Sequence, residues 1–307
     1  MSENNPLQHV AKVALVVQPG QNHLRAYSAH LGTWADQAVT VNTGEGDVYL
    51  TGTNAALVVQ PGQNHLRAYS ALTGTWADQA VTVNTGEGDV YQTAGNVALV
   101  VQPGQNHLRA YSAITGTWAD QAVTVNTGEG DVYLTGANTA LVVQPGQNHL
   151  RAYSALTGTW ADQAVTVNTG EGDVYLIGAN TALVVQPGQN HLRAYSAITG
   201  TWADQAVTVN TGEGDVYLTG ANTALVVQPG QNHLRAYSAL TGTWASLSVT
   251  VNPGEGDVYR ASGDVALVVQ PGQNHLRAYS AVTGTWADQA VTVNTGEGDI
   301  YLVGTGI

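Results

Sequence analysis

Short apolar runs alternate with polar turns along the whole chain, and the pattern repeats. The peptide QPGQNHLRAYSA starts every 42 residues, at Gln18, Gln60, Gln102, Gln144, Gln186, Gln228 and Gln270. In the second copy, Val, Tyr, Thr and Trp concentrate in four segments: Asp47 to Leu50, Ala56 to Gln60, His65 to Ala71 and Thr75 to Val83. No stretch has the periodicity of a helix. The pattern predicts seven copies of a four-stranded all-β unit.

The gaps between these segments have the composition of turns. In the tetrapeptide from Gln60 to Gln63, Pro61 and Gly62 occupy the central positions. Proline presets φ near −65° and glycine accepts a positive φ, which together favour a type II turn. Thr73-Gly74 and Gly86-Glu87-Gly88 mark two further reversals. Four strands joined by such short turns form an antiparallel meander.

A single sheet of this kind cannot bury both of its faces, so the copies must stack on one another. The first and last copies carry the same apolar strands as the middle ones, without the polar outer face that an open stack needs. We therefore expect a closed seven-bladed β-propeller with four antiparallel strands per blade. The expected organisation is a polar head, residues 1–12, and a single domain, residues 13–307. We expect the surplus copy of the first strand, Asp299 to Leu302, to complete the blade that begins at Val13.

The peptide from Ala68 to Trp76, AYSALTGTW, resembles the tryptophan-docking motif of quinoprotein (PQQ-type) propellers. In that motif an alanine is followed by an aspartate, then Thr-Gly, then a tryptophan. Here Ser70 replaces the aspartate, and the gap from Gly74 to Trp76 is two residues shorter. The resemblance implies a propeller fold and a packing role for the tryptophan. It does not imply quinone binding or dehydrogenase activity, which need an asymmetric site.

The amino-acid composition argues against several classes of binding partner and of catalytic chemistry. The net charge is −13, with Lys12 as the single lysine, and such a surface repels nucleic acid and anionic lipid. The absence of cysteine excludes disulfides and thiol catalysis. The apolar run Val13 to Val17 is too short for a signal peptide or a membrane span. We expect a cytoplasmic protein without a cofactor, although release without a leader remains open.

Strand alternation places two loops of each copy on one face: the loop from Gln63 to His65 and the loop from Asn84 to Asp89. These loops are richer in hydrogen-bonding and ionisable groups than the loops of the other face. The predicted ligand-binding residues are the Asn, His, Glu and Asp at equivalent positions of all seven copies: Asn22, His23, Glu45, Asp47, Asn64, His65, Glu87, Asp89, Asn106, His107, Glu129, Asp131, Asn148, His149, Glu171, Asp173, Asn190, His191, Glu213, Asp215, Asn232, His233, Glu255, Asp257, Asn274, His275, Glu297 and Asp299.

Each of these residue types also has a structural interpretation. His65 can ligate a metal or form a hydrogen bond at a hairpin end. Glu87 and Asp89 can hold sugar hydroxyls or a cation, or they can be solvated and cap a turn. The loop lacks the spacing of a calcium-binding loop, although seven inward carboxylates could form a ring.

Two further residues of the unit favour a structural role. Trp76 lies towards the opposite face, where packing between blades is the preferred interpretation over sugar stacking. Arg67 alternates with His65 along one strand, and a buried arginine there needs an acid partner, either Asp78 or Asp89.

The sequence contains no nucleophile elbow, phosphate loop or unique pair of carboxylates. Catalysis needs several different groups at one site, whereas repetition of weak sites raises avidity. We therefore expect a non-catalytic multivalent binding protein, foremost a carbohydrate-binding lectin. The alternatives are a structural or protein-interaction propeller without a small ligand, and a metal-binding ring. The sixth copy differs most from the others, with Ser246-Leu247-Ser248 in place of Asp-Gln-Ala.

Overall fold

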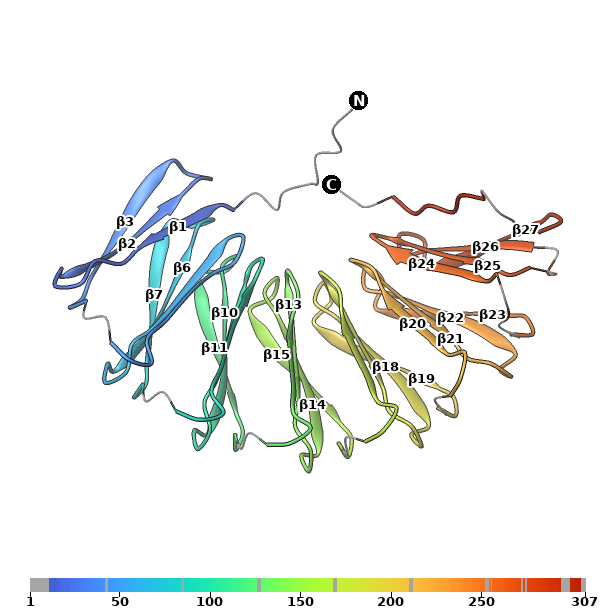
Figure 1. The fold of residues 1–307 in the computed structure, drawn as a ribbon, viewed down its shortest axis with the longest axis horizontal. Helices are drawn as coiled ribbons and strands as arrows, with labels where there is room; N and C mark the ends of the chain where they lie inside the picture. The colour runs from blue at the N-terminus through green and yellow to red at the C-terminus, as the bar shows by residue number, and fades with distance from the viewer. Residues whose placement is uncertain are drawn as a thin grey trace. The chain divides into compact units, whose positions relative to one another are not determined.

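The computed structural model describes residues 11–41, 44–83, 86–125, 128–167, 170–209, 212–251, 254, 256–271, 273, 275–293 and 299–304. These residues form 27 strands and no helix. The strands belong to seven antiparallel sheets (Figure 1), numbered here 1 to 7 along the chain. Within the described residues, sheet 1 has three strands and each of the others has four. The all-β class and the seven repeated antiparallel sheets are thus confirmed.

The strands of each sheet follow one another in the sequence. Sheet 1 contains β1 (Val13–Val16), β2 (His23–Ser28) and β3 (Thr33–Ala38). Sheet 2 contains β4 (Val48–Thr51), β5 (Ala55–Val59), β6 (His65–Ser70) and β7 (Thr75–Ala80). Sheet 3 contains β8 (Val90–Ala94), β9 (Val97–Val101), β10 (His107–Ser112) and β11 (Thr117–Ala122). Sheet 4 contains β12 (Val132–Thr135), β13 (Thr139–Val143), β14 (His149–Ser154) and β15 (Thr159–Ala164).

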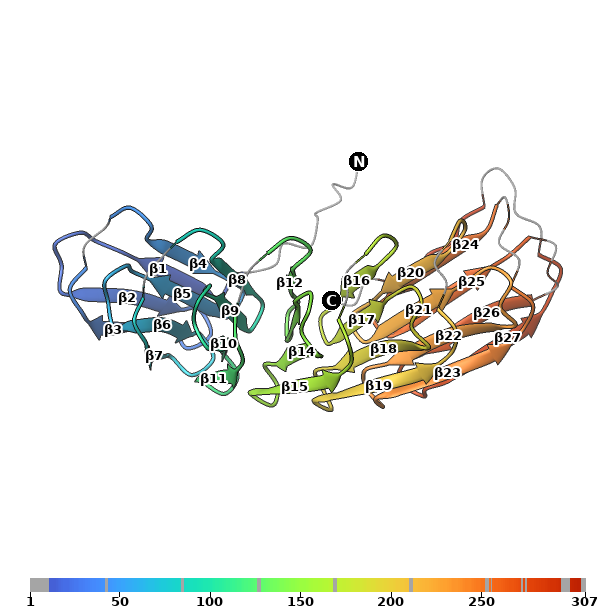
Figure 2. The same ribbon diagram turned by 90° about the horizontal axis from the view of Figure 1, so that it is seen from below.

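The remaining sheets keep the same order, which Figure 2 shows most clearly for β20 to β23. Sheet 5 contains β16 (Val174–Ile177), β17 (Thr181–Val185), β18 (His191–Ser196) and β19 (Thr201–Ala206). Sheet 6 contains β20 (Val216–Thr219), β21 (Thr223–Val227), β22 (His233–Ser238) and β23 (Thr243–Ser248). Sheet 7 contains β24 (Val258–Ser262), β25 (Val265–Val269), β26 (His275–Ser280) and β27 (Thr285–Ala290).

The chain divides into two compact units, residues 1–140 with 153–160 and 307, and residues 141–152 with 161–306. The first unit contains sheets 1 to 3 and the second contains sheets 5 to 7. The single domain over residues 13–307 and the closure of the ring stay predictions. Asp299 to Leu302 form no strand, and the side chains of Ile300 and Leu302 are 78% and 82% exposed.

The fourth strand of each repeat is shorter than predicted. In sheet 2 it ends at Ala80 rather than at Val83. Val81 and Val83 instead donate backbone hydrogen bonds to the carbonyls of Asn64 and Gln63. The predicted type II turn from Gln60 to Gln63 is confirmed, since Gly62 has a φ of 77° and Gln63 N donates to Gln60 O at 3.2 Å.

The core lies between neighbouring sheets. In the first unit, Leu57 and Leu66 of sheet 2 form one buried cluster with Val100 and Tyr111 of sheet 3, all with 0% exposure. β5 is buried along its whole length, as expected for a strand covered on both faces. Burial of these apolar side chains is the main source of stability at the sheet junctions.

Polar bonds also join neighbouring sheets. Ser70 donates from its hydroxyl to Ala113 O at 2.5 Å, and the indole of Trp118 donates to Ala77 O at 3.1 Å. Equivalent serine and tryptophan bonds recur in both units. Because each bond uses a fixed backbone carbonyl, it specifies the position of one sheet against the next.

Rows of side-chain amides run across the loops after the first strands. In the first unit, Asn54 Nδ2 donates to Asn96 Oδ1 at 2.6 Å, and Asn96 donates to Asn138 at 2.6 Å. In the second unit, Asn180 donates to Asn222 at 2.6 Å, and Asn222 donates to Asp264 Oδ1 at 2.5 Å. Each of these four bonds therefore points from one repeat towards the next one along the sequence.

Candidate functional site

The Gly-Glu-Gly-Asp loop that precedes each first strand is a second type II turn. In the loop before β8, Asp89 N donates to Gly86 O at 3.3 Å and Gly88 has a φ of 85°. This geometry aims the Asp89 side chain back at the start of the loop, where its Oδ2 accepts from Gly86 N at 2.9 Å. Glu87 occupies the second position of the turn and is exposed. The turn thus separates two neighbouring acids, one bound to backbone and one facing solvent.

The loop aspartate of each repeat is also hydrogen-bonded to the first strand, as Asp47, the equivalent of Asp89, shows. Asp47 and Tyr49 are two positions apart, so their side chains lie on the same side of the strand. Tyr49 donates its phenolic hydrogen bond to Asp47 Oδ2 at 2.8 Å, and Gln60 Nε2 donates to the Tyr49 oxygen at 3.4 Å. Burial, together with the hydrogen bond to Asp47 and its negative charge, raises the pKa of Tyr49 to about 12. The phenol therefore acts as a hydrogen-bond donor rather than as an acid or base near neutral pH.

A pocket lies between two successive loops of this kind. It has a volume of about 570 Å³ and is lined by Glu87, Gly88, Val90, Pro103, Gly128, Asp131 and Tyr133. One loop contributes Glu87, the next contributes Asp131, and the Gln-Pro-Gly turn contributes Pro103. The lining combines carboxylate oxygens with the apolar surfaces of a proline, a valine and a tyrosine ring. Concave sites with this mixture suit small polar ligands that also have an apolar face.

An equivalent pocket recurs in the second unit. It has a volume of about 440 Å³ and is lined by Glu213, Gly214, Pro229 and Gly254. Each of these positions lies 126 residues, or three repeats, beyond its counterpart in the first pocket. The pocket is therefore a property of the repeat and not an accident of one loop.

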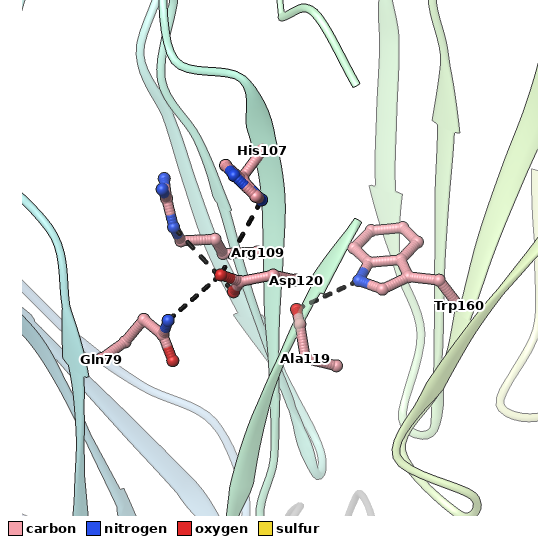
Figure 3. Close-up of polar contacts among 6 residues, drawn as sticks. All are labelled: Gln79, His107, Arg109, Ala119, Asp120 and Trp160. Atoms are coloured by element: carbon pink, nitrogen blue, oxygen red, sulfur yellow. Dashed lines mark hydrogen bonds and ion pairs between the residues drawn. The ribbon is translucent and has the colours of Figure 1, made fainter. Parts of the chain in front are cut away.

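No predicted histidine lines either of these two pockets, and His107 belongs to a different set of contacts (Figure 3). The register of β10 and β11 places Arg109 opposite Asp120 and His107 on the same side of the sheet. His107 Nδ1 lies 3.9 Å from Asp120 Oδ2, and Arg109 Nε lies 4.0 Å from Asp120 Oδ1. Gln79 of sheet 2 donates to Asp120 Oδ2 at 3.1 Å. We call Gln79, His107, Arg109 and Asp120 the Asp120 cluster.

The Asp120 cluster identifies the acid partner of the buried arginine. Arg109 is 4% exposed, and burial lowers its pKa while the charge of Asp120 raises it. Of the two acids considered from the sequence, the partner is thus the aspartate of the fourth strand and not the aspartate of the loop. Gln79 was not among the residues predicted for any site, because its partner lies in the neighbouring sheet.

Glu45, Glu129 and Glu171 are exposed like Glu87, and Asp299 accepts from the Tyr301 hydroxyl at 3.1 Å. The remaining predicted residues fall into three groups. The asparagines have exposed side chains and accept backbone hydrogen bonds through their carbonyls, as Asn64 does from Val81 N at 3.0 Å. The loop aspartates accept from a glycine N–H and a tyrosine hydroxyl as Asp89 does, and they are Asp47, Asp131, Asp173, Asp215 and Asp257. Three predicted residues lie outside the described part of the chain: Glu255, Asn274 and Glu297.

The tryptophans are half-buried at the sheet junctions rather than placed near the pocket. The ring of Trp118 lies 5.5 Å from the ring of Tyr111 at an angle of 52°, in addition to its bond to Ala77. Trp34 of sheet 1 is an exception, with 58% exposure. These contacts are those of a packing residue.

Across the described ranges, no group of three or more His, Asp or Glu side chains is placed to hold a metal ion. No helix in this part of the chain is long and apolar enough to cross a membrane. The cytoplasmic location stays a prediction.

Comparison with known proteins finds likeness in structure alone. No family model matches the chain, and no curated protein matches it. A streptogramin B lyase structure is 14% identical over 81% of this chain and 84% of its own, with a TM-score of 0.31. Kluyveromyces lactis Hsv2 is 12% identical over 94% of this chain and 96% of its own, with a TM-score of 0.32. AztD from Citrobacter koseri is 10% identical over 92% and 95%, with a TM-score of 0.30. No activity is carried over from these proteins to this chain.

Proposed function

We propose that this chain is a non-catalytic binding protein that uses its repeated Gly-Glu-Gly-Asp pockets to hold a sugar. The observation that carries the proposal is the recurrence of one pocket, with equivalent residues, in two separate places. Several equal sites give little advantage to a catalyst, which needs different groups at one point. They suit a protein that binds a target displaying many copies of a weak ligand, where avidity exceeds the affinity of one site by roughly 10²–10⁴-fold.

The chemistry of the pocket suits a hydroxylated ligand. Glu87 makes no hydrogen bond or ion pair with another described residue, so both of its carboxylate oxygens can accept from sugar hydroxyls. Asp131 Oδ2 is engaged by Gly128 N and by the Tyr133 hydroxyl, which fixes the carboxylate while Oδ1 remains available. Val90 and Pro103 offer apolar surface to the C–H groups of a sugar ring.

A glycan array tests the proposal, with the parent protein and two multiple variants. The first variant replaces the loop glutamate by glutamine in all seven repeats, as in Glu87→Gln. The second replaces the strand histidine by alanine in all seven, as in His65→Ala, and serves as the matched control because the histidines do not line the pocket. We expect glycan binding by the parent and the histidine variant, and a loss of at least tenfold in the glutamate variant.

Two outcomes would contradict this assignment. Binding that survives the glutamate change but not the histidine change would move the site to the Asp120 cluster. If the parent binds no glycan, the structural or protein-interaction propeller is the better description. That alternative is favoured by one observation, namely that the loop aspartates are already engaged in turn capping.

A further inference from the structure

In the Asp120 cluster, one carboxylate accepts a hydrogen bond from Gln79 and lies within ion-pair distance of His107 and Arg109. Gln79 reaches it from the preceding sheet, while His107 and Arg109 reach it from the adjacent strand. The same arrangement recurs in the second unit, where Gln163 Nε2 donates to Asp204 Oδ2 at 3.2 Å and His191 Nδ1 lies 3.9 Å from it. The carboxylate therefore balances a buried guanidinium and collects the remaining donors.

Sheet 6 keeps the three donors but lacks the carboxylate. Gln205 of β19 and His233 and Arg235 of β22 occupy the donor positions. The register of β22 and β23 places Arg235 opposite Ser246, where the other repeats have aspartate. A serine side chain is shorter than aspartate by most of a carboxylate group, and it carries no charge. The substitution thus removes both an acceptor and the volume that it filled.

Arg235 is nonetheless as buried as its counterparts. It is 5% exposed, and its Nε and Nη1 atoms have no hydrogen-bond partner within the described residues, as in Arg109 and Arg193, but it also has no carboxylate nearby. Burial lowers its pKa, and no carboxylate counteracts this effect as Asp204 does for Arg193. Arginine remains protonated in proteins, so the charge persists. A buried cation without a counter-ion is strongly unfavourable.

The other substitutions of this repeat do not supply a counter-ion. Ser248 Oγ lies 3.2 Å from His233 Nε2, so the serine forms a hydrogen bond with the histidine. A hydroxyl that donates to Nε2 leaves the proton on Nδ1, the nitrogen that faces the carboxylate in sheet 5. In that tautomer His233 has a proton on Nδ1 that it can donate to an acceptor.

We propose that Gln205, His233 and Arg235 bind a small free anion, either a halide or a formate-sized carboxylate, in the place of the missing aspartate side chain. The anion neutralises the guanidinium and accepts from the glutamine amide and the histidine. Ser246 is exposed, so the site opens to solvent and exchanges its occupant. This site is independent of the sugar pocket, which uses none of these residues.

The test compares three proteins that differ at one position each. The parent has one such site, Ser246→Asp fills it with an internal carboxylate, and Asp204→Ser creates a second copy in sheet 5. Ser246→Asp restores the residue found in the other repeats, so it is expected to fold. Crystals soaked in bromide should give anomalous density beside Arg235 in the parent, none there in Ser246→Asp, and density beside both Arg235 and Arg193 in Asp204→Ser.

Thermal unfolding provides the solution measurement. We expect sodium chloride and sodium formate to raise the Tm of the parent by roughly 2–4 °C more than sodium gluconate of equal ionic strength, because an anion that binds only the folded state stabilises it. Ser246→Asp should lose this difference and Asp204→Ser should enlarge it. An equal response in the parent and Ser246→Asp overturns the proposal, as does bromide density in the crystal without any response in solution.

Discussion

The indole nitrogen of Trp118 donates a hydrogen bond to the carbonyl of Ala77, 3.1 Å away in the preceding sheet. Its ring packs at the edge of the cluster that contains Tyr111 and Val100. The residue thus connects two sheets through a specific bond and through apolar burial.

Replacing Trp118 by alanine is expected to lower the free energy of unfolding by roughly 3 kcal/mol, near the lower end for large aromatic residues because the ring is half-buried. Thr117→Ala is the control, since that neighbouring side chain is exposed. Urea unfolding followed by far-UV circular dichroism measures both. Equal stability of the two variants would show that the indole contributes little to the junction.

The two acids of one loop should respond differently to neutralisation. Asp131→Asn weakens the bonds from Gly128 N and Tyr133, and hydrogen bonds to a charged group contribute about 1.5–3 kcal/mol each, so we expect a loss of about 1–2 kcal/mol for this half-buried side chain. Glu129→Gln, at the exposed second position of the same turn, should leave the stability unchanged. Chemical denaturation compares them, and the reverse order of stabilities would contradict the assigned roles.

Alkaline pH should unfold the protein through its buried phenols. The pKa of Tyr49 is raised from 10.0 to about 12, so the folded state holds this proton more tightly than the unfolded state does. The corresponding stability is fully present below pH 10 and is lost as the pH rises from about 10 to about 12. Absorbance at 295 nm should show tyrosine ionisation that is delayed and coincides with the loss of circular dichroism. Ionisation of all tyrosines near pH 10 in the folded protein would contradict this.

Restoring the glutamine of the sixth repeat should strengthen one junction. Leu247 replaces the glutamine that would donate to Asp288, and His275 Nδ1 instead lies 2.8 Å from that carboxylate. We expect Leu247→Gln to raise the free energy of unfolding by about 0.5 kcal/mol, a small value because Asp288 is partly exposed. Gln79→Ala should lower it by a similar amount. Denaturation midpoints measure both changes, and a loss of stability in Leu247→Gln would show that leucine packing outweighs the hydrogen bond.

The predicted closing strand is testable by truncation. In the described residues, the large exposed apolar side chains all belong to the first or the last repeat: Leu31, Trp34, Val265, Val282, Val291, Ile300 and Leu302. Deletion of residues 298–307 is expected to lower the Tm by several degrees and to promote aggregation through a free sheet edge. Deletion of residues 303–307, which spares the predicted strand, is the control. An unchanged Tm after the longer deletion would count against closure.

The sheets were predictable because local signals agree with one another in every repeat. Glycine and proline at fixed offsets define the turns, and the β-branched residues between them define the strands. The end of the fourth strand was less predictable, since Val81 and Val83 read as strand but donate to a loop. Periodicity reports which residues are apolar, not which carbonyl accepts each backbone hydrogen bond.

The sequence predicted that the two loops of each repeat lie close together, as the pocket shared by Glu87 and Pro103 shows, but not which contacts each side chain makes. In the sequence Glu87 and Asp89 are simply two acids of one loop, and only the turn geometry shows that Asp89 accepts a backbone hydrogen bond. A usable signal was present, namely the Asp-x-Tyr spacing that puts Asp89 beside Tyr91 on one side of a strand. Gln79 had no such signal, because a bond between sheets depends on how the sheets pack and not on spacing within one of them.

The rows of side-chain amides make the order of the repeats along the chain matter. An asparagine accepts from one neighbour and donates to the next, so it can stand anywhere inside a row. Asp264 accepts from Asn222 but, when ionised, has no proton to pass on. A chain in which the repeat of Asp264 is transplanted to the middle would interrupt its row there. Nearly identical copies are for this reason not interchangeable, since the repeat of Asp264 can end a row of amides but cannot stand inside one.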